Sequence, residues 1–203
     1  MVVSALVLAQ LVSAAAACST LSIGLTPSQA DGYGSADLGM AIGQTFYAPS
    51  TEIQSLTVWR VANEDTLLDG MHLYICSVDS TGTPHPESLL LDGPTVTVPY
   101  GDGVHPIEHR FDFDPPFRLP APGLYAFFLQ ASPCYGWFDV IADNKNDYQQ
   151  GSKWQTQRSL SGCTLRSFPS EYPTSDLVFQ IQFCDETTPV KVRSWGAIKS
   201  LYR

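Results

Sequence analysis

Polar aromatic residues are concentrated in one stretch of the second half of the chain. Tyr135, Trp137, Tyr148 and Trp154 occur within about twenty residues, interleaved with acids and amides that include Gln155. The apolar C–H face of a pyranose stacks on aromatic rings, while planar amides and acids bond its hydroxyl groups. The stretch therefore predicts a carbohydrate-binding surface, carried mainly by Tyr148 and Trp154. The alternative is that these rings, Trp137 first among them, belong to the core, where most large aromatic residues lie.

The loop between these aromatic residues offers oxygen ligands for a cation. Asp143, Asn146 and Asp147 lie close together in it, and Ca²⁺ takes about six to eight oxygen ligands in proteins. Lys145 stands where an EF-hand would have an acid or an amide, so a calcium site here would be of another kind. The favoured alternative is that Asn and Asp form turns by bonding to their own backbone. No other feature of the sequence requires a cofactor.

Motifs for hydrolytic catalysis are missing from the sequence. Neither a G-x-S-x-G elbow nor an H-E-x-x-H helix occurs in it. Asp112 and Asp114 could form a glycosidase pair, whose carboxylates lie about 5 to 10 Å apart. They alternate with Phe111 and Phe113, however, as the polar face of an amphipathic strand would. We therefore expect that the protein is not an enzyme.

The charge balance limits the class of partner. The 203 residues include 11 Lys and Arg against 20 Asp and Glu, which gives a formal net charge of -9. Because no basic stripe is present to bind phosphates, nucleic acid is not expected as a partner. With 44% hydrophobic and 15% charged residues, the chain can bury the core of one domain.

The first 17 residues predict an export signal. An apolar run from Val2 to Val12 is followed by three alanines at 15–17, directly before Cys18. This pattern is typical of a signal peptide with an A-x-A cleavage site, and the run is shorter than the roughly 20 residues of a transmembrane helix. We expect an extracellular or cell-surface protein without a transmembrane segment. A lipoprotein acylated on Cys18 is the second interpretation, although Ala15 stands where a lipobox prefers Leu.

Disulfide bonds are expected in an oxidising compartment. The five cysteines contain no C-x-x-C pair, so a structural zinc site is not expected. With Cys18 at the processed terminus, the other four could form two disulfides in three ways. We favour Cys134 with Cys163, because both lie in polar segments that follow strands. This choice leaves Cys76 and Cys184.

The elements that would position the aromatic residues are β-strands. Helix signals are almost absent, while short alternating runs bounded by Gly, Pro, Asn and Asp recur. At 176–184, Leu177, Phe179, Ile181 and Phe183 share one face, as in a half-buried strand of period two. Seven more strands are expected, with turns between them, at 44–48, 53–61, 71–78, 95–98, 108–113, 124–131 and 137–142. About eight strands favour an all-β fold, an antiparallel two-sheet, jelly-roll-like β-sandwich.

The expected organisation has four parts. They are a signal peptide at 1–17, an N-terminal extension at 18–40, a β-sandwich domain at 41–186 and a basic tail at 187–203. The tail contains Lys and Arg but no acid. Together with Cys18, it offers a means of attachment to a surface.

Four segments carry a family pattern: "GQTFYAPSTEIQSLTVW" at 43–59, "FDFDPPFRLPAPGLYAFFL" at 111–129, "NDYQQGSKWQT" at 146–156 and "DLVFQIQF" at 176–183. Their order and spacing resemble a family of exported bacterial β-sandwich modules. In that family a G-Q-T-F strand, an F-x-F-x-x-P-x-x-L turn, an N-x-Y-x-x-G loop and a D-L-x-F strand follow one another. The resemblance implies a jelly-roll-like accessory or surface domain, related to carbohydrate-binding domains and largely without assigned activity. None of its motifs is catalytic.

The favoured function is a non-catalytic, exported binding module for a carbohydrate or another cell-surface partner. The alternative is a structural component of the cell surface or matrix that binds no small ligand. A secreted glycan-active enzyme is the least favoured of the three. The exposure of Trp154 in the folded chain bears directly on the choice between the first two.

Overall fold

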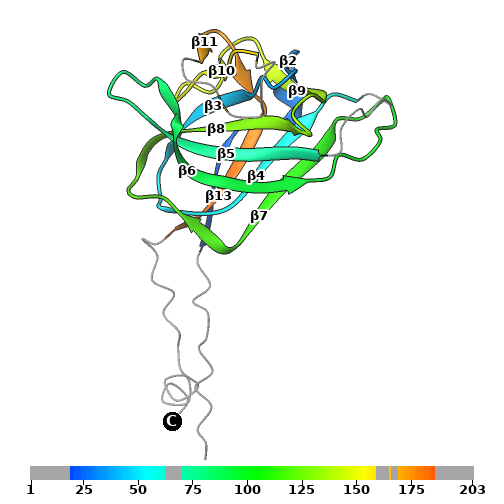
Figure 1. Cartoon of the computed structure of the whole chain (residues 1–203). Coiled ribbons are helices and arrows are strands. Elements are labelled where there is room, and N and C mark those ends of the chain that lie inside the picture. Colours follow the sequence, from blue (N-terminus) through cyan, green and yellow to red (C-terminus); the bar gives the residue numbers. More distant parts are fainter. Residues whose placement is uncertain (1–18, 63–69, 159–164, 166–168, 186–203) are drawn as a thin grey trace, which may run out of the picture.

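The chain folds almost entirely into strands (Figure 1). The computed structural model describes residues 19–62, 70–158, 165 and 169–185. These residues form two antiparallel sheets that pack face to face, which confirms the all-β sandwich predicted from the sequence. The described part contains 13 strands rather than about eight, and one 3-10 turn, η1 (Pro27–Gln29).

The first sheet is built around β4 and β9. Its main order is β1 (Ser19–Gly24), β13 (Phe179–Asp185), β4 (Glu52–Arg60), β9 (Trp137–Asp143) and β12 (Asp176–Leu177). Two further strands join it: β2 (Gly32–Asp37) pairs with β9, and β7 (Ile107–Arg118) pairs with β4. Residues before 41, expected as an extension, thus contribute β1 and β2 to this sheet.

The second sheet has six strands. Their order is β11 (Ser170–Tyr172), β10 (Lys153–Gln155), β3 (Ile42–Ala48), β8 (Gly123–Ser132), β5 (Gly70–Val78) and β6 (Pro84–Val96). In Figure 1, β2, β10 and β11 lie at the upper end of the sandwich, whereas the start of β1 and the end of β13 lie at the lower end.

The core fills the space between the two sheets. Phe179, Ile181 and Phe183 of β13 are fully buried, while Gln180 and Gln182 are partly exposed, so the predicted face of this strand is confirmed. Period-two alternation places apolar side chains of both sheets into one cluster. Burial of this apolar surface is the main stabilising contribution to the fold.

Six of the eight expected strands lie close to their expected bounds. The strand expected at 95–98 is only the end of the longer β6, and the one expected at 176–184 is divided into β12 and β13. The segment 79–88 was expected as a turn, yet β6 starts within it at Pro84. Proline cannot donate to a sheet, but it is tolerated on an edge strand, and β6 is the last strand of the second sheet. Four short strands, β1, β2, β10 and β11, were not expected, because three to six residues carry little periodicity.

A small second core covers the outer face of the second sheet. It contains Ala41, Cys76, Ala126, Phe128 and Trp154, all buried. Gly43 of β3 pairs with Phe128 on one side and with Trp154 on the other. A Cβ atom on Gly43 would lie 2.5 Å from the Phe128 ring. The glycine of the G-Q-T-F motif therefore leaves room for the Phe128 ring of the neighbouring strand β8.

The cysteines differ in part from the expected pairing. Cys76 is a free, buried thiol, so the expectation that left it to pair with Cys184 is wrong. Burial raises the pKa of the Cys76 thiol to about 12. Cys134 and Cys184 are each disulfide-bonded, with partners outside the described residues. Cys18 and Cys163 lie outside that part of the chain.

We expect one free thiol in the oxidised chain that starts at Cys18. Thr20 lies opposite Cys184 in the β1–β13 pair and is two residues from Cys18, so peptide mapping should find Cys18 linked to Cys184 and Cys134 linked to Cys163. A thiol reagent should label only Cys76 after denaturation without reductant. Labelling of three thiols would contradict this assignment. A bonded Cys18 would also have no free sulfur for acylation.

The predicted signal peptide and basic tail lie outside the described residues. Within the described part, no helix has the length and apolar character needed to cross a membrane.

Candidate functional site

The aromatic-rich stretch is anchored by a buried polar cluster that links the two sheets. Asp176 of β12 is fully buried; its Oδ1 accepts a hydrogen bond from Gln44 Nε2 at 2.8 Å, and its Oδ2 accepts one from the Tyr148 backbone N–H at 3.0 Å. Gln44 Oε1 in turn accepts a hydrogen bond from the Leu177 N–H at 2.8 Å. Asp176 of the D-L-x-F motif is thus hydrogen-bonded to Gln44 of the G-Q-T-F motif.

The end of the N-x-Y-x-x-G loop is fixed to the same strand. The Thr45 N–H donates to the Ser152 carbonyl at 3.0 Å, and the Ser152 N–H donates to Thr45 Oγ1 at 2.8 Å. Gly151 lies so close to Thr45 that a Cβ atom would be 1.9 Å from the Thr45 carbonyl oxygen. Three of the four motifs therefore meet in one place, where they hold the loop 143–152 against β3.

Tyr148 was expected to face a ligand, but it belongs to the core. It is 7% exposed, and its ring packs edge-on against Phe179 with the centroids 5.1 Å apart. Its hydroxyl oxygen accepts a hydrogen bond from the Tyr47 N–H at 3.2 Å. Burial raises the pKa of Tyr148 to about 12. A ring packed in this way has no free face for a sugar, so this expectation is wrong.

Trp154 is also not an exposed platform. It is 6% exposed and lies in the second core with Phe128 and Cys76, at the position of β10 opposite Gly43. The expectation of an exposed ring was based on its polar neighbours, which alternate to the other side of β10. Trp154 is among the residues that line a hollow of about 350 Å³, together with Asn146 and residues 149–152 of the loop.

The loop acids behave as turn residues rather than as an open cation site. Asp143 is fully buried; its Oδ1 accepts from the Lys145 N–H at 3.2 Å and its Oδ2 from the Asp147 N–H at 2.8 Å. Asn146 has a φ of 55°, a left-handed conformation that Asn tolerates in turns. Among the described residues, no group of three or more His, Cys, Asp or Glu could hold a metal ion. These contacts favour the turn alternative over the calcium interpretation.

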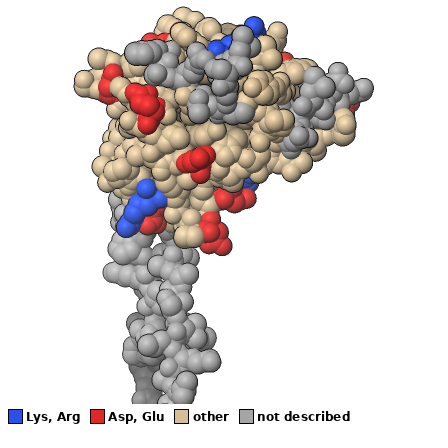
Figure 2. Space-filling model, in the orientation of Figure 1, with Lys and Arg blue, Asp and Glu red and all other residues tan. Residues whose placement is uncertain are grey.

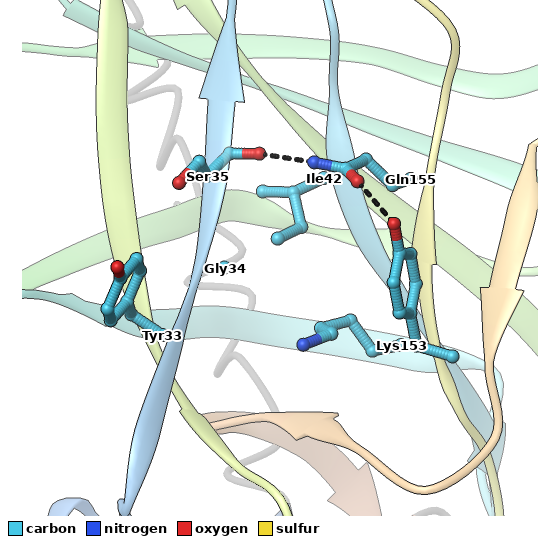
Figure 3. A pocket seen from close by; sticks show the side chains of 7 residues that line it. Tyr33, Gly34, Ser35, Ile42, Lys153 and Gln155 are labelled. Carbon is cyan, nitrogen blue, oxygen red and sulfur yellow. Dashed lines mark hydrogen bonds between the residues drawn. The ribbon is translucent and has the colours of Figure 1, made fainter.

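A groove lies on the other side of β10, between β10 and β2 (Figure 3). Its volume is about 170 Å³. Alternation along β10 directs Lys153 and Gln155 to this side and Trp154 to the opposite side. The lining residues are Tyr33, Gly34, Ser35, Ile42, Lys153, Gln155 and Tyr172.

Two exposed tyrosine rings border this groove, and one is held in place. Tyr33 is 62% exposed and Tyr172 is 41% exposed. The Tyr172 hydroxyl donates to Gln155 Oε1 at 2.8 Å, and Gln155 Nε2 donates to the Ser35 carbonyl at 2.8 Å (Figure 3). Gln155 thus connects β11 to β2 and fixes the orientation of the Tyr172 ring.

Lys153 forms part of the groove and is 8% exposed. Its Nζ lies 5.1 Å from the centroid of the Tyr172 ring, a cation–π distance. Burial lowers the pKa of Lys153, and the nearby Asp176 carboxylate opposes that shift. Its backbone N–H donates to the Ser175 carbonyl at 2.9 Å, which fixes its place on the sheet.

The structure separates the five residues that were expected to form one surface. Gln155 lines the groove, and Tyr148 and Trp154 are buried. Tyr135 is exposed and Trp137 is partly buried at the start of β9, and neither lines the groove. The residues not foreseen from the sequence are Tyr33, Lys153 and Tyr172. A tyrosine between two glycines in "GYG" at 32–34 was the available signal for an exposed ring at Tyr33.

The chain is thus a β-sandwich with a surface groove that is bordered by the exposed rings of Tyr33 and Tyr172. No protein-family model and no curated protein matches the chain. Among solved structures, the chain resembles a clostridial cysteine protease, Cwp84, after propeptide cleavage, with a TM-score of 0.52 and 14% identity over 82% of this chain. It spans 40% of that longer chain.

A second similar structure contains the cysteine protease and lectin-like domains of Cwp84, a surface layer associated protein of Clostridium difficile. Its TM-score is 0.48 at 12% identity, and the match covers 78% of this chain and 37% of that one. At such low identity, the likeness to Cwp84 concerns the fold alone.

Proposed function

We propose that the chain is a non-catalytic carbohydrate-binding module and that the groove between β2 and β10 is its binding site. The observation that carries this proposal is the pair of exposed tyrosine rings, Tyr33 and Tyr172, beside the amide of Gln155. Aromatic faces and a planar amide are the groups that bind the apolar and polar sides of a sugar ring.

The groove suits a small unit of a glycan chain. Its volume of about 170 Å³ is below the roughly 300 to 1,000 Å³ of pockets for drug-sized ligands. A single sugar ring that projects from a longer chain fits a site of this size. The hydrogen bonds of Gln155 to Tyr172 and to Ser35 hold part of the site in place before binding, which reduces the entropic cost of association.

The surface charge of the described residues gives no sign of a basic face that would capture a polyanion such as nucleic acid. On the face shown in Figure 2, acidic and basic side chains are scattered among uncharged ones, and no basic face is formed there. Together with the predicted export signal and the resemblance to exported modules, this supports a role at the cell surface or outside the cell. The same features support the structural alternative, so glycan binding must be measured directly.

We expect Tyr33→Ala and Tyr172→Ala each to weaken glycan binding at least about fivefold, because a stacked ring contributes about 1 kcal/mol. Polysaccharide pull-down, followed by calorimetric titration with the glycan retained, would measure the change. Tyr100→Ala is the matched control, since Tyr100 is 78% exposed and does not line the groove.

The outcomes separate the two functions. Binding that Tyr33→Ala and Tyr172→Ala leave unchanged would place the glycan site elsewhere and refute the groove. If the folded chain binds no polysaccharide on a broad panel, the carbohydrate proposal fails and the structural alternative remains. Circular dichroism of each variant checks that the fold is retained.

A further inference from the structure

A buried cation faces the groove without a counter-ion. Lys153 is more than nine-tenths buried, and Figure 3 shows its Nζ directed into the space between β2 and β10. Within the described part of the chain, its ammonium group makes no ion pair or hydrogen bond. A buried ammonium that lacks such partners is unfavourable, because it has lost part of its hydration.

The nearest acid does not fill this role. Asp176 attracts Lys153 electrostatically, but within the described residues the two form no ion pair, and the Asp176 oxygens accept hydrogen bonds from Gln44 and from the Tyr148 backbone. The contact of Lys153 with the Tyr172 ring compensates only in part, since cation–π contacts are weaker than a charge-assisted hydrogen bond to an anion. An anionic group in the groove would satisfy the ammonium.

We propose that the groove selects sugar units that carry a carboxylate, the uronic acids. This inference rests on the proposed carbohydrate-binding function and names its substrate class. Lys153 Nζ pairs with the carboxylate of the bound unit, while the rings of Tyr33 and Tyr172 contact the apolar parts of the sugar. Ser35 and Gln155 provide polar groups on the same groove.

The overall charge makes the prediction more specific. At a net charge of -9, the protein repels polyanions at long range, so selectivity comes from the local pair with Lys153. We therefore expect the preference for the carboxylate to be a property of the bound state, visible when acidic and neutral forms of one sugar are compared.

Matched ligands test this directly. Short oligomers of galacturonic, mannuronic and guluronic acid are titrated against the folded wild-type chain, each beside its fully methyl-esterified form, which keeps the ring and removes the charge. We expect at least one acidic oligomer to bind about tenfold more tightly than its ester. The comparison uses the wild-type chain and does not depend on any variant folding correctly.

Variants then locate the charge. Lys153→Met keeps an unbranched stem and should reduce the affinity for the acid to that of the ester, whereas Lys153→Arg should keep the difference. Lys145→Met is the control: Lys145 is an exposed lysine paired with Asp31 at 2.9 Å and does not line the groove. A difference between acid and ester that Lys153→Met leaves intact would overturn the proposal.

Failure of this inference differs from failure of the proposed function. If neutral glycans bind in a manner that depends on Tyr33 and Tyr172, but acids bind no better than esters, the carboxylate proposal is wrong and the groove remains a sugar site. Absence of binding to every acidic oligomer also overturns it. Absence of binding to all glycans, neutral and acidic, refutes both.

Discussion

Replacing Gly151 with alanine should lower the free energy of unfolding by about 2 to 3 kcal/mol, the upper range for overpacking a close contact. A Cβ atom at this position would lie 1.9 Å from the carbonyl oxygen and 2.7 Å from the carbonyl carbon of Thr45. Both are backbone atoms of β3, a central strand between β10 and β8. They cannot move aside as a flexible side chain would, so the loop itself must shift.

That shift would break the contacts that fix the loop. The three hydrogen bonds between Thr45 and Ser152 are the first to be lost. The hydrogen bond from the Tyr148 N–H to Asp176 is then lost through the same displacement. Urea unfolding measures the effect, and Gln150→Ala is the control, because Gln150 is exposed in the same loop. Equal urea midpoints for Gly151→Ala and wild type would show that stability does not depend on the close approach of Gly151 to the Thr45 backbone.

The second large effect concerns Asp176 and pH. Burial is the main cause that raises the pKa of Asp176 from 3.8 to about 6, and the charges of Asp143 and Asp147 add to it. The hydrogen bonds from Gln44 and the Tyr148 N–H oppose the shift. Because the folded pKa lies above the unfolded one, the folded state retains a proton that the unfolded state loses between these values.

The bound proton stabilises the folded state fully below about pH 4, the unfolded pKa. This stabilisation is lost as the pH rises through about 6, the folded pKa. A shift of about two pKa units corresponds to about 3 kcal/mol. The side chain of the Asp176→Asn variant does not titrate. Its amide NH₂ group would face one of the two hydrogen-bond donors, either Gln44 Nε2 or the Tyr148 N–H. The variant should therefore be less stable than wild type at pH 4. The stability gap should then shrink by about 3 kcal/mol between pH 4 and pH 7.

Urea unfolding of wild type and of Asp176→Asn at intervals of half a pH unit measures this gap. The contributions of all other titratable groups are the same in the two proteins and cancel in the difference. Gln150→Ala, which changes no titratable group and is exposed in the same loop, is the control and should show a gap that does not change with pH. A gap for Asp176→Asn that stays constant would contradict the raised pKa. A gap that widens with rising pH would mean that the hydrogen bonds and Lys153 outweigh burial.

Much of the fold could be predicted from the sequence, because the longer strands alternate apolar and polar residues over seven or more positions. The closing strand with Phe179, Ile181 and Phe183 is the clearest example. The short strands β10 and β11 have three residues each, too few to show a period. Their places depend on pairing with β3, which involves residues far away in the chain.

The candidate site was predicted less well for a related reason. Tyr33 and Tyr172 are far apart in the sequence and border one groove only because β11 pairs with β10 while β2, in the other sheet, lies across the groove from β10. Trp154 was misplaced because it is buried in a cluster with Cys76 and Phe128, residues of other strands that its own polar neighbours in the sequence do not reveal. Gln155 was foreseen at a ligand site, and it lines the groove between the two tyrosines.

The family motifs gain a physical meaning that the sequence alone did not provide. Gln44, Gly151 and Asp176 belong to three different motifs, and all three fix the same loop against the sheet. They account for architecture, while the residues of the groove lie largely outside the motif positions. The loop is thus held in place by residues other than those whose side chains border the groove.

The pairing of β1 with β13 has a mechanical consequence. Ser19 and Asp185 lie opposite each other at one end of this antiparallel pair. The strands β2, β10 and β11, whose residues line the groove, lie at the other end of the sandwich (Figure 1). Tension applied between these two residues would separate the strands one hydrogen bond at a time, like a zipper, because the bonds run perpendicular to the strands. A covalent link between Cys18 and Cys184 would carry that load and leave the groove undisturbed.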